Sequence, residues 1–247
     1  MSTQPIYQGI ARALKQATAA RSGALQLLDI GAGRGELITL LGATMPIEAQ
    51  ACDYHVERFA LKDVEIRQIN LNLESLPYQE RSFDIVTCSE VIEHLENYRA
   101  LFRQVHRILK PGGLFVVTTP NVLNLKSRLR YFLTGFASLF GPLPVKNANL
   151  ASTGGHITPI PYFYLAHALL DADFTGIELS IDKAQKTSRA ALIFFAPILW
   201  LGWRRFLARE AHAFKTLDPV NTPYVEQHNG VLLLLGRTVI CLSRKAG

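Results

Sequence analysis

The chain has 247 residues, of which 49% are hydrophobic and 19% are charged, and its formal net charge is +6 at pH 7. This length and hydrophobic content are enough for a substantial core, so we expect one α/β domain with insertions over residues 1–247. The positive excess is mild and does not by itself indicate a protein that binds nucleic acid.

The three cysteines and the N-terminus indicate the compartment. Cys52, Cys88 and Cys241 lie in separate apolar runs without the spacing of a metal site, so we expect buried free thiols in a reducing compartment. Residues 1–24 are polar, with helical spacing over 7–20, and lack the apolar core of a signal peptide. We therefore expect a cytoplasmic protein.

A glycine turn between an apolar strand and a helix is the first stretch that suggests chemistry. Residues 25–30 form an apolar run of strand length. Gly31, Gly33 and Gly35 follow at alternate positions, and residues 36–42 have the spacing of a helix. Glycine lets a ligand lie against bare main chain, and a helix N-terminus offers unpaired N–H groups. This order predicts a ligand-binding turn.

The spacing of this turn distinguishes it from other glycine-rich loops. Asp29 precedes it, which gives the pattern Asp-x-Gly-x-Gly-x-Gly. The dinucleotide fingerprint needs its third glycine one residue later, and the phosphate loop needs a Gly-Lys-Ser/Thr ending. The pattern resembles the first motif of class I S-adenosylmethionine-dependent methyltransferases. The resemblance implies that Asp29, Gly31, Ala32 and Gly33 bind the methionine end of that cofactor, and an ordinary strand–helix turn is the alternative.

An acidic residue follows the next predicted strand, residues 47–52. Asp53 comes about 20 residues after the glycine turn, where a carboxylate can accept hydrogen bonds from ribose hydroxyls. The methyltransferase resemblance implies the same role, and we also assign the adjacent Tyr54 to the cofactor site. Alternatively, Asp53 caps a helix over 55–61, and the two roles can coexist.

The third predicted strand, residues 64–69, leads into a departure from the family pattern. Methyltransferases of this class usually have an Asp here, whose carboxylate meets the adenine amine, followed by an apolar residue whose N–H meets a ring nitrogen. This chain has Asn70 and Leu71. An amide oxygen still accepts a hydrogen bond from an amine, so we assign both residues to the cofactor site. Asn72 is a rival for the role of Asn70.

The fourth and fifth predicted strands, residues 82–89 and 114–118, enclose a helix over 98–109 that ends at Lys-Pro-Gly-Gly. The order of a helix, Leu-Lys-Pro-Gly-Gly and a β-branched strand is a signature of the same methyltransferases. In that family the acid at the start of the fourth strand commonly serves structure, so we do not consider Asp84 catalytic.

The end of the fourth strand indicates the branch of the family. The resemblance places Ser89 and Glu90 beside the cofactor. Residues 90–95 read Glu-Val-Ile-Glu-His-Leu. This segment is most similar to relatives that methylate quinone precursors, glycan or lipid-linked groups and other small molecules. The matching motifs cover residues 25–119, in a consistent order and spacing.

The remaining chain predicts two insertions. Residues 121–157 hold no clear strand but have helical spacing over 125–140, and the resemblance implies a substrate cover here. Residues 183–228 form a second, apolar and helical insertion. The other expected elements are a loop and helix over 156–170, a strand over 174–181 and a last strand over 231–242 with a bulge or bend at Gly236.

Two histidines are candidates for catalysis. Methyl transfer requires mainly that the protein align the nucleophile, and a base is needed only for a hydroxyl that stays protonated. His94 follows the fourth strand at the ligand-binding edge of the sheet, so it is the first candidate for a base or positioning group. His156, in a Gly-Gly-His loop, is the second. For both, the alternative is a histidine whose hydrogen bonds are satisfied by local backbone.

A metal site is another use for the same histidines. On a helix, Glu90, Glu93 and His94 would share one face, and with His156 they could bind a divalent cation. Some members of the family that act on RNA ends or quinone catechols use such a Glu-x-x-Glu-His group. Relatives without metal have the same letters, so we assign no metal ligands on this pattern alone.

A long span without acidic residues bears on the acceptor. No Asp or Glu occurs between Glu96 and Asp171. Four cations lie near the expected substrate cover: Lys126, Arg128, Arg130 and Lys146. Clustered cations raise the local concentration of anions, so we predict an acceptor that bears phosphate or carboxylate. A solvated basic face is the alternative.

Residues 190–203 are uncharged, strongly apolar and contain both tryptophans of the chain. Basic residues flank this run on both sides: Lys183, Lys186, Arg189, Arg204, Arg205 and Arg209. The run is shorter than the roughly 18 residues of a membrane span. Basic flanks and tryptophans suit a helix that lies in the membrane interface, which would make the protein peripheral at the inner face of the membrane. The alternative is a helix buried against the core or against the partner in a homodimer.

Together these patterns predict the fold and the function. The alternation of strands and helices indicates an α/β fold. The resemblance implies a Rossmann-like, doubly wound sheet of seven mostly parallel strands, with the last strand antiparallel and with helical insertions. We expect methylation, on oxygen, of a small or lipid-linked acceptor such as a glycan, a quinone-like compound or an envelope precursor.

Two alternatives to this function stay open. One is methylation of RNA or of a carboxylate, although no basic stripe with interleaved stacking aromatics is long enough to follow an RNA strand. The other is a non-catalytic module that kept the cofactor pocket, which Asn70 favours because it departs from the family pattern.

Overall fold

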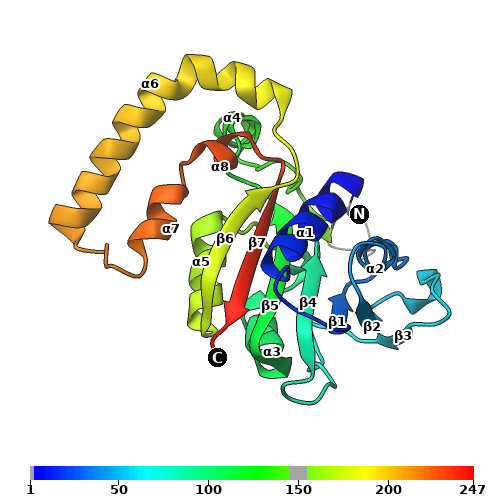
Figure 1. The fold of residues 1–247 in the computed structure, drawn as a ribbon. Coiled ribbons are helices and arrows are strands. Elements are labelled where there is room, and N and C mark those ends of the chain that lie inside the picture. Colours follow the sequence, from blue (N-terminus) through cyan, green and yellow to red (C-terminus); the bar gives the residue numbers. More distant parts are fainter. Residues whose placement is uncertain (1–2, 145–154) are drawn as a thin grey trace.

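A seven-stranded sheet forms the centre of the protein (Figure 1). The computed structural model describes residues 3–144 and 155–247. The strand order is 3-2-1-4-5-7-6, and only β7 runs antiparallel to its neighbours. The strands are β1 (Leu25–Ile30), β2 (Ile47–Asp53), β3 (Glu65–Gln68), β4 (Phe83–Ser89), β5 (Leu109–Pro120), β6 (Phe174–Ile181) and β7 (Thr238–Lys245). The predicted doubly wound fold is confirmed.

Helices cover both faces of this sheet. They are α1 (Gln4–Ala17), α2 (Glu36–Gly42), α3 (Tyr98–Ile108), α4 (Leu125–Thr134), α5 (Tyr162–Asp171), α6 (Lys186–Arg209), α7 (Thr222–Gln227) and α8 (Val231–Leu235). Figure 1 shows α1 and α2 on one face and α3 and α5 on the other. Short 3₁₀ turns at Val56–Arg58 and Ile92–His94 and a π-helical turn at Glu210–Phe214 complete the set of helical elements in the described ranges.

The two helical layers explain why the central strands are apolar throughout. Successive residues of a strand point to opposite faces. Leu27 packs with α1 and α2, whereas Leu28 packs with α3 and α5, and both are fully buried. Each such side chain contributes about 1.5–3 kcal/mol relative to an exposed one. The continuous apolar run of β1 therefore follows from burial on both faces.

The sheet topology places the glycine turn at the ligand-binding edge. β1 pairs with β2 on one side and with β4 on the other, so the direction of winding reverses at β1. In such sheets, ligands bind beyond the carboxyl ends of the strands at this reversal. The glycine turn follows β1 and residues 90–95 follow β4, so the fold brings these two segments together.

The last strand is where the sequence prediction is partly wrong. The structure has the helix α8 at Val231–Leu235, and β7 begins only at Thr238. Periodicity alone cannot separate a buried strand from a buried helix in a short apolar run. The amide of Asn121 donates to the carbonyls of Leu233 and Gly236, and this tertiary contact holds the end of α8 beside the end of β5.

The helix predicted over 55–61 is also wrong, since only a 3₁₀ turn forms at Val56–Arg58. The Ala60 N–H donates to the carbonyl of Arg34, and Leu61 packs against Gly35. These contacts with the glycine turn extend the chain where local spacing favours a helix.

The first insertion contains a shorter helix than predicted. The Asn124 side chain caps α4 by accepting from the Ser127 N–H, and Gly135, with φ 74°, ends it at Thr134 instead of near residue 140. Lys146 and the rest of residues 145–154, part of the expected substrate cover, lie outside the described residues.

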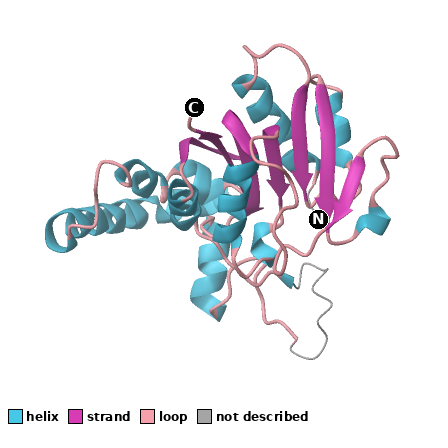
Figure 2. Ribbon diagram, turned by 90° about the horizontal axis from the view of Figure 1, so that it is seen from below, coloured by secondary structure: helices cyan, strands magenta, loops and turns pink. Residues whose placement is uncertain are grey.

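The second insertion contains the long helix α6, which projects away from the sheet (Figures 1 and 2). With 24 residues, α6 extends the apolar run into its basic flanks, so the predicted run of 14 residues understated its length. By length and composition, the helical segment Lys186–Phe214 could cross a membrane. Ile193 and Phe194 are 77% and 79% exposed, so the alternative in which this segment is buried against the core is wrong.

The three cysteines are buried and free, as predicted. Cys52 and Cys88 lie at the ends of β2 and β4, and Cys241 lies in β7.

Candidate active site

The turn after β1 consists of three glycines with positive φ. Gly31, Gly33 and Gly35 have φ values of 73°, 56° and 85°. Residues with a Cβ rarely adopt this conformation, so the turn requires glycine. The Gly31 N–H donates to the carbonyl of Cys52 at 2.8 Å, which joins the turn to the end of β2. Ala32 donates to the same carbonyl at 3.3 Å.

Gly31 and Gly33 differ in what surrounds them. A Cβ on Gly31 would lie 2.2 Å from Cγ2 of Val91, because the segment after β4 packs against the turn. A Cβ on Gly33 would meet nothing within 4 Å. The main chain at Gly33 therefore faces open space, as a ligand that lies against it requires.

Asp53 connects the end of β2 to the glycine turn. Its Oδ2 accepts from the Gly33 N–H at 2.8 Å, and its Oδ1 accepts from the His55 N–H at 2.8 Å. The predicted capping role is wrong, because the residue that precedes the 3₁₀ turn at Val56–Arg58 is His55 and the turn has no side-chain cap. Each carboxylate oxygen has a second lone pair, so Asp53 can hold the turn and still accept hydrogen bonds from a sugar.

Asp29 lies buried beneath the turn. Its Oδ1 accepts from Oγ1 of Thr87 on β4 at 2.7 Å. Burial raises the pKa of Asp29 to about 7, the hydrogen bond from Thr87 opposes this rise, and the nearby charge of Asp53 adds to it. Without a cation beside it, the Asp29 carboxyl group therefore titrates near neutral pH.

The loop after β3 uses its two asparagines differently. Asn70 Oδ1 accepts from the Asn72 N–H at 3.1 Å, which leaves that oxygen one lone pair for an adenine amine. Asn72 Oδ1 accepts from the Glu96 N–H at 2.9 Å, and its amide donates to the carbonyl of His94 at 3.4 Å. Asn72 thus joins the loop to the segment that contains His94, which favours Asn70 for the cofactor.

Two other predicted cofactor residues lie toward the surface of this edge. Tyr54 is 56% exposed and directly follows Asp53. Leu71 packs against the core and helps to line a hollow of about 220 Å³ between the loop after β3 and α3.

Glu90 directly follows β4 and is a non-glycine residue with a φ of 56°. Its N–H donates to Oγ1 of Thr118 on β5 at 3.1 Å, and its Oε1 accepts from the same hydroxyl at 3.3 Å. The Ser89 hydroxyl lies 3.2 Å from Oγ1 of Thr118. Burial raises the pKa of Glu90 to about 7. Positive φ at such a residue costs roughly 1–3 kcal/mol and is found mostly at functional sites.

The expectation that Glu90, Glu93 and His94 share a helix face is wrong. The positive φ of Glu90 interrupts the helical repeat, and only a 3₁₀ turn follows at Ile92–His94. The structure instead groups Glu93 and His94 with His156, since one nitrogen or oxygen of each lies within 4.8 Å of the others. Of the four residues that the sequence offered as a possible cation site, the structure thus brings three together and leaves Glu90 outside the group.

Main-chain hydrogen bonds join the two segments that build this group. The N–H groups of Ile157 and Thr158 donate to the carbonyl of Glu93 at 2.9 and 3.0 Å. His94 Nδ1 lies 3.0 Å from the carbonyl of Gly155, and the rings of His94 and His156 pack edge to face at 4.7 Å. Because a carbonyl only accepts, Nδ1 of His94 bears the proton and Nε2 has a free lone pair.

Burial determines the charge of this group. It raises the pKa of Glu93 well above its usual value, and the nearby Glu90 adds to the rise. It lowers the pKa of His94, and it lowers that of His156 to about 4, with the neighbouring His94 adding to the effect. The two imidazoles are therefore neutral at pH 7, and burial favours the protonated form of Glu93.

Two buried polar atoms of the group lack a partner in the described ranges. They are Glu93 Oε1 and His156 Nδ1. With His94, which offers one ligand atom within 4.8 Å of a ligand atom of each, these two residues form a group that fits a divalent cation. The same neutral imidazoles could instead accept a proton from a bound hydroxyl. Both kinds of chemistry are compatible with this arrangement.

Sequence reasoning missed three threonines that support these acids. Thr87, Thr118 and Thr119 donate to Asp29, Glu90 and Glu93, respectively. The signal was present, because a hydroxyl within a buried strand must find a hydrogen-bond partner. The partners could not be named, since they depend on which strands are neighbours.

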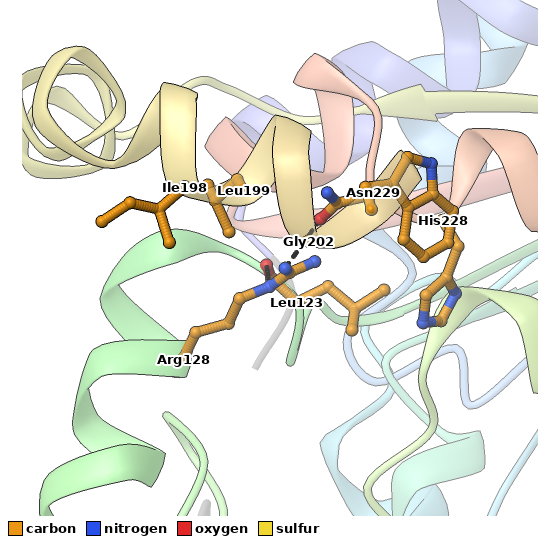
Figure 3. A pocket seen from close by; sticks show the side chains of 8 residues that line it. Leu123, Arg128, Ile198, Leu199, Gly202, His228 and Asn229 are labelled. Atoms are coloured by element: carbon orange, nitrogen blue, oxygen red, sulfur yellow. Dashed lines mark hydrogen bonds between the residues drawn. The ribbon is translucent and has the colours of Figure 1, made fainter. Parts of the chain in front are cut away.

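A second hollow lies between α4 and α6 (Figure 3). It has a volume of about 340 Å³ and is lined by Leu123, Arg128, Ile198, Leu199, Gly202, Trp203, His228 and Asn229. Arg128 Nε donates to the carbonyl of Leu123 at 2.6 Å, and Nη1 donates to Oδ1 of Asn229 at 2.7 Å. The other predicted cations of α4, Lys126 and Arg130, are exposed. Only Arg128 among them thus lines an apolar hollow.

Comparison with known proteins identifies the family. A family model described as a methyltransferase domain matches residues 5–179, which is more than half of the chain. The chain belongs to this methyltransferase family. The match includes the glycine turn, Asp53 and the group formed by Glu93, His94 and His156. The predicted family and its cofactor, S-adenosylmethionine, are confirmed.

Individual relatives are similar over part of their length. The ubiquinone biosynthesis O-methyltransferase of Pseudomonas syringae pv. tomato is 35% identical over 106 residues, which are 39% of this chain and 44% of that protein. The chain spans less than half the length of the curated relatives that it matches first.

Solved structures of methyltransferases share the fold. A methyltransferase from Archaeoglobus fulgidus superposes with a TM-score of 0.59 and 15% identity over 97% of this chain and 94% of that one. Phosphoethanolamine N-methyltransferase 2 of Haemonchus contortus, in complex with S-adenosylmethionine, has a TM-score of 0.53 and 16% identity over 97% of this chain and 53% of that one. At such identities the likeness establishes the fold alone.

The substitution Gly31→Ala should remove cofactor binding. Both the positive φ and the approach to Val91 exclude a Cβ at this position. We expect the dissociation constant for S-adenosylmethionine to rise by about tenfold or more, since a shift of the turn that costs about 1.4 kcal/mol of binding energy has that effect. Isothermal titration calorimetry would measure it.

Gly23→Ala is the matched control for this substitution. Gly23 has a φ of 85°, but a Cβ there would meet nothing within 4 Å. This variant should bind the cofactor as the wild type does. Equal affinities for Gly31→Ala and the wild type would contradict a cofactor site at this turn.

Asp29→Asn should change how stability depends on pH. The folded pKa of about 7 exceeds the ordinary value of 3.8, so the stability that Asp29 contributes is present below pH 3.8 and is lost as pH rises toward 7. Asn keeps an acceptor for Thr87 and does not titrate. Between pH 5 and 8, the wild type should lose about 3 kcal/mol of unfolding free energy relative to the variant. Urea unfolding without cofactor would measure this, and parallel pH curves would exclude a raised pKa.

Proposed function

We propose that this protein transfers a methyl group from S-adenosylmethionine to an oxygen of a small or lipid-linked acceptor. The acceptor class that we propose is a quinone-like compound, a glycan or an envelope precursor. The observation that carries the proposal is the group at the carboxyl edge of the sheet, where the bond from His94 Nδ1 to the Gly155 carbonyl leaves Nε2 unprotonated. A free imidazole nitrogen at this edge suits an acceptor that must lose a proton.

The residues of the chain divide the work of this reaction. The cofactor supplies an electrophilic methyl carbon on a sulfonium when it is bound. The glycine turn, Asp53, Asn70 and Glu90 would hold it and fix the direction of approach. His94 Nε2 would accept the hydroxyl proton of the acceptor as the oxygen–carbon bond forms, and His156 would position that hydroxyl. Neutral histidines suit this task, since a protonated imidazole could not act as a base.

The hollow beside Arg128 supports an acceptor that is both anionic and apolar. Arg128 uses two of its five N–H groups in the hydrogen bonds to Leu123 and Asn229, and the guanidinium has no acidic partner in the described residues. Leu199 and Trp203 give the opposite wall an apolar character. A phosphate or carboxylate with an attached hydrocarbon chain would match both properties.

The relatives agree with this class of acceptor. Ubiquinone biosynthesis O-methyltransferases from Pseudomonas syringae pv. tomato and Rickettsia conorii are similar to this chain over 39% of its length. Their names support an oxygen acceptor on a quinone-like compound. Within the family, acceptors vary, and another similar protein is an arsenite methyltransferase. The acceptor therefore has to be assigned from the residues of this chain.

We place the protein in the cytoplasm, peripheral at the inner face of the membrane, because its three buried thiols are free and its α6 is exposed and apolar.

A non-catalytic cofactor-binding module is the second candidate function. One observation favours it: Asn70 replaces the usual acid, and its oxygen already accepts from Asn72. Turnover on any acceptor excludes this candidate.

His94→Asn should abolish most of the activity without loss of the cofactor. The Asn amide can occupy the place of Nδ1 and keep the bond to Gly155, but it has no group in place of Nε2. We expect kcat to fall by about 10²- to 10⁴-fold, as for loss of a general base. The measurement is transfer of a radiolabelled methyl group to a farnesylated dihydroxybenzoate, together with calorimetry for S-adenosylmethionine.

His167→Asn is the matched control, since His167 lies on α5 and contacts Arg99 outside the proposed site. It should leave kcat unchanged. An unchanged kcat in His94→Asn would refute the role of His94. The same assay after dialysis against a chelator tests the metal alternative, because loss of activity that Mg²⁺ or Zn²⁺ restores would show that the group binds a metal.

Arg128→Gln should weaken binding of an anionic amphiphile. Loss of a charge-assisted hydrogen bond costs about 1.5–3 kcal/mol, so the dissociation constant for farnesyl phosphate should rise at least tenfold. The affinity for uncharged farnesol should stay the same. Quenching of tryptophan fluorescence would measure both, because Trp203 lines the hollow.

Arg130→Gln is the control on the same helix, because Arg130 is exposed. It should bind farnesyl phosphate as the wild type does. If both variants bind equally well, or if both lose the same affinity, the basic residues of α4 form only a solvated face.

A further inference from the structure

Helix α6 presents an apolar face to the surroundings. Residues spaced three and four apart share one side of a helix. The members of this side in the middle of α6 are Ile193, Phe194, Pro197, Ile198, Trp200 and Leu201, which we call the apolar face of α6. Phe194, Ile198 and Trp200 are 79%, 70% and 60% exposed. A contiguous patch of large apolar side chains on a surface marks an interaction site.

The two ends of the helix are basic. Lys183, Lys186 and Arg189 precede the apolar face and Arg204, Arg205 and Arg209 follow it, and we call these groups the basic ends of α6. No Asp or Glu occurs from residue 183 to residue 209. The Arg204 guanidinium lies 4.9 Å from the centre of the Trp200 ring. An apolar centre between cations matches a lipid surface, where acyl chains lie below anionic headgroups.

The course of the chain argues against a helix that crosses the bilayer. The N-terminal end is fixed to the domain, because the Gln185 N–H donates to the carbonyl of Leu235. On the other side, α7 is fixed to α5 by the bond from the Phe163 N–H to His228. Only residues 215–221 connect the π-helical turn to α7. Seven residues reach at most about 25 Å, less than the roughly 30 Å of a hydrocarbon core.

The shape of α6 is consistent with a position within the interface. Pro197 lies inside the helix, where it removes a main-chain hydrogen bond and favours a bend. Figure 1 shows that α6 arches and that its convex side faces away from the sheet. An arch of this kind lets the apolar middle enter the lipid while the basic ends stay at the headgroups.

A second copy of the chain fits this surface less well. Both ends of α6 are basic, so two α6 helices packed side by side would set cations opposite cations in either orientation. The apolar faces alone would favour such a dimer, but no acidic residue on α6 offsets the repulsion. An anionic bilayer satisfies both the apolar face and the basic ends.

We propose that α6 lies in the interface of an anionic membrane, with its apolar face among the upper acyl segments and its basic ends at lipid phosphates. This inference extends the proposed function. The link between membrane docking and a lipid-linked acceptor rests on that proposed function. The helix forms one wall of the hollow beside Arg128, so docking opens this hollow to the lipid surface. The family match ends at residue 179, so α6 lies in a part of this chain that the family model does not cover.

The tryptophans allow a direct test with the full chain. The protein has two tryptophans, Trp200 and Trp203, and both lie in α6. Vesicles of phosphatidylcholine with 30% phosphatidylglycerol — roughly the anionic content that attracts basic segments — should shift their emission to the blue and carry the protein in a flotation assay. Pure phosphatidylcholine vesicles should bind at least about tenfold less, because the basic ends of α6 then have no partner.

Two variants distinguish insertion of the apolar face of α6 from non-specific adsorption to vesicles. Phe194→Glu should reduce binding to the anionic vesicles by about tenfold or more, since it places a charge in the apolar face. Tyr164→Glu, at an aromatic side chain of α5 that is 55% exposed, should bind like the wild type. Equal loss in both variants, or binding without a blue shift, would overturn the proposal.

The remaining outcomes also decide the matter. A shift already present without vesicles, together with a dimer in sedimentation velocity, would assign the apolar face to a second copy. Calorimetry for S-adenosylmethionine on each variant keeps the two proposals apart. Loss of vesicle binding with intact cofactor affinity confirms the role of α6, whereas absence of cofactor binding in the wild type would refute the methyltransferase proposal and leave the vesicle result standing.

Discussion

Hydrogen bonds between the glycine turn and the end of β2 are the constraint on which the candidate site depends. The carbonyl of Cys52 accepts from the first N–H of the turn, and the carboxylate of Asp53 accepts from Gly33. These bonds hold a turn with three left-handed glycines at alternate positions in one conformation. Val91 packs so closely against Gly31 that a methyl group at this position would clash with it. The turn, the end of β2 and the segment after β4 therefore form one unit, and each position predicted to bind the cofactor depends on the others.

The polar groups behind this unit are held in a low-dielectric interior. Thr87, Thr118 and Thr119 each satisfy a carboxyl group that burial has made less acidic. The cost of burial favours the uncharged forms of Glu93 and His156. Such an environment strengthens each interaction with an incoming ligand, because water does not screen it.

The chain beyond the matched region adds the exposed helix α6 to the methyltransferase domain. The matched region contains the sheet edge with the residues that are predicted to bind the cofactor, whereas α6 lies beyond it and contributes little to the core. α4 and α6 are in contact and enclose the hollow at Arg128. A cofactor site that is common to a family cannot discriminate between acceptors. We therefore expect the residues that select the acceptor to lie where the matched region meets α6.

Local patterns determined much of this protein by themselves. Apolar runs, glycine spacing and the position of Asp53 predicted the strands, the turn and an acid beside it, since each pattern depends on residues close together in the sequence. The order of the seven strands came from the resemblance to methyltransferases. Only the tertiary structure decided the rest. It replaced half of a predicted strand by α8, grouped His156 with Glu93, and gave the threonines their partners. It also showed that α6 is exposed instead of buried. These features depend on contacts between distant segments, and periodicity along the chain does not contain that information.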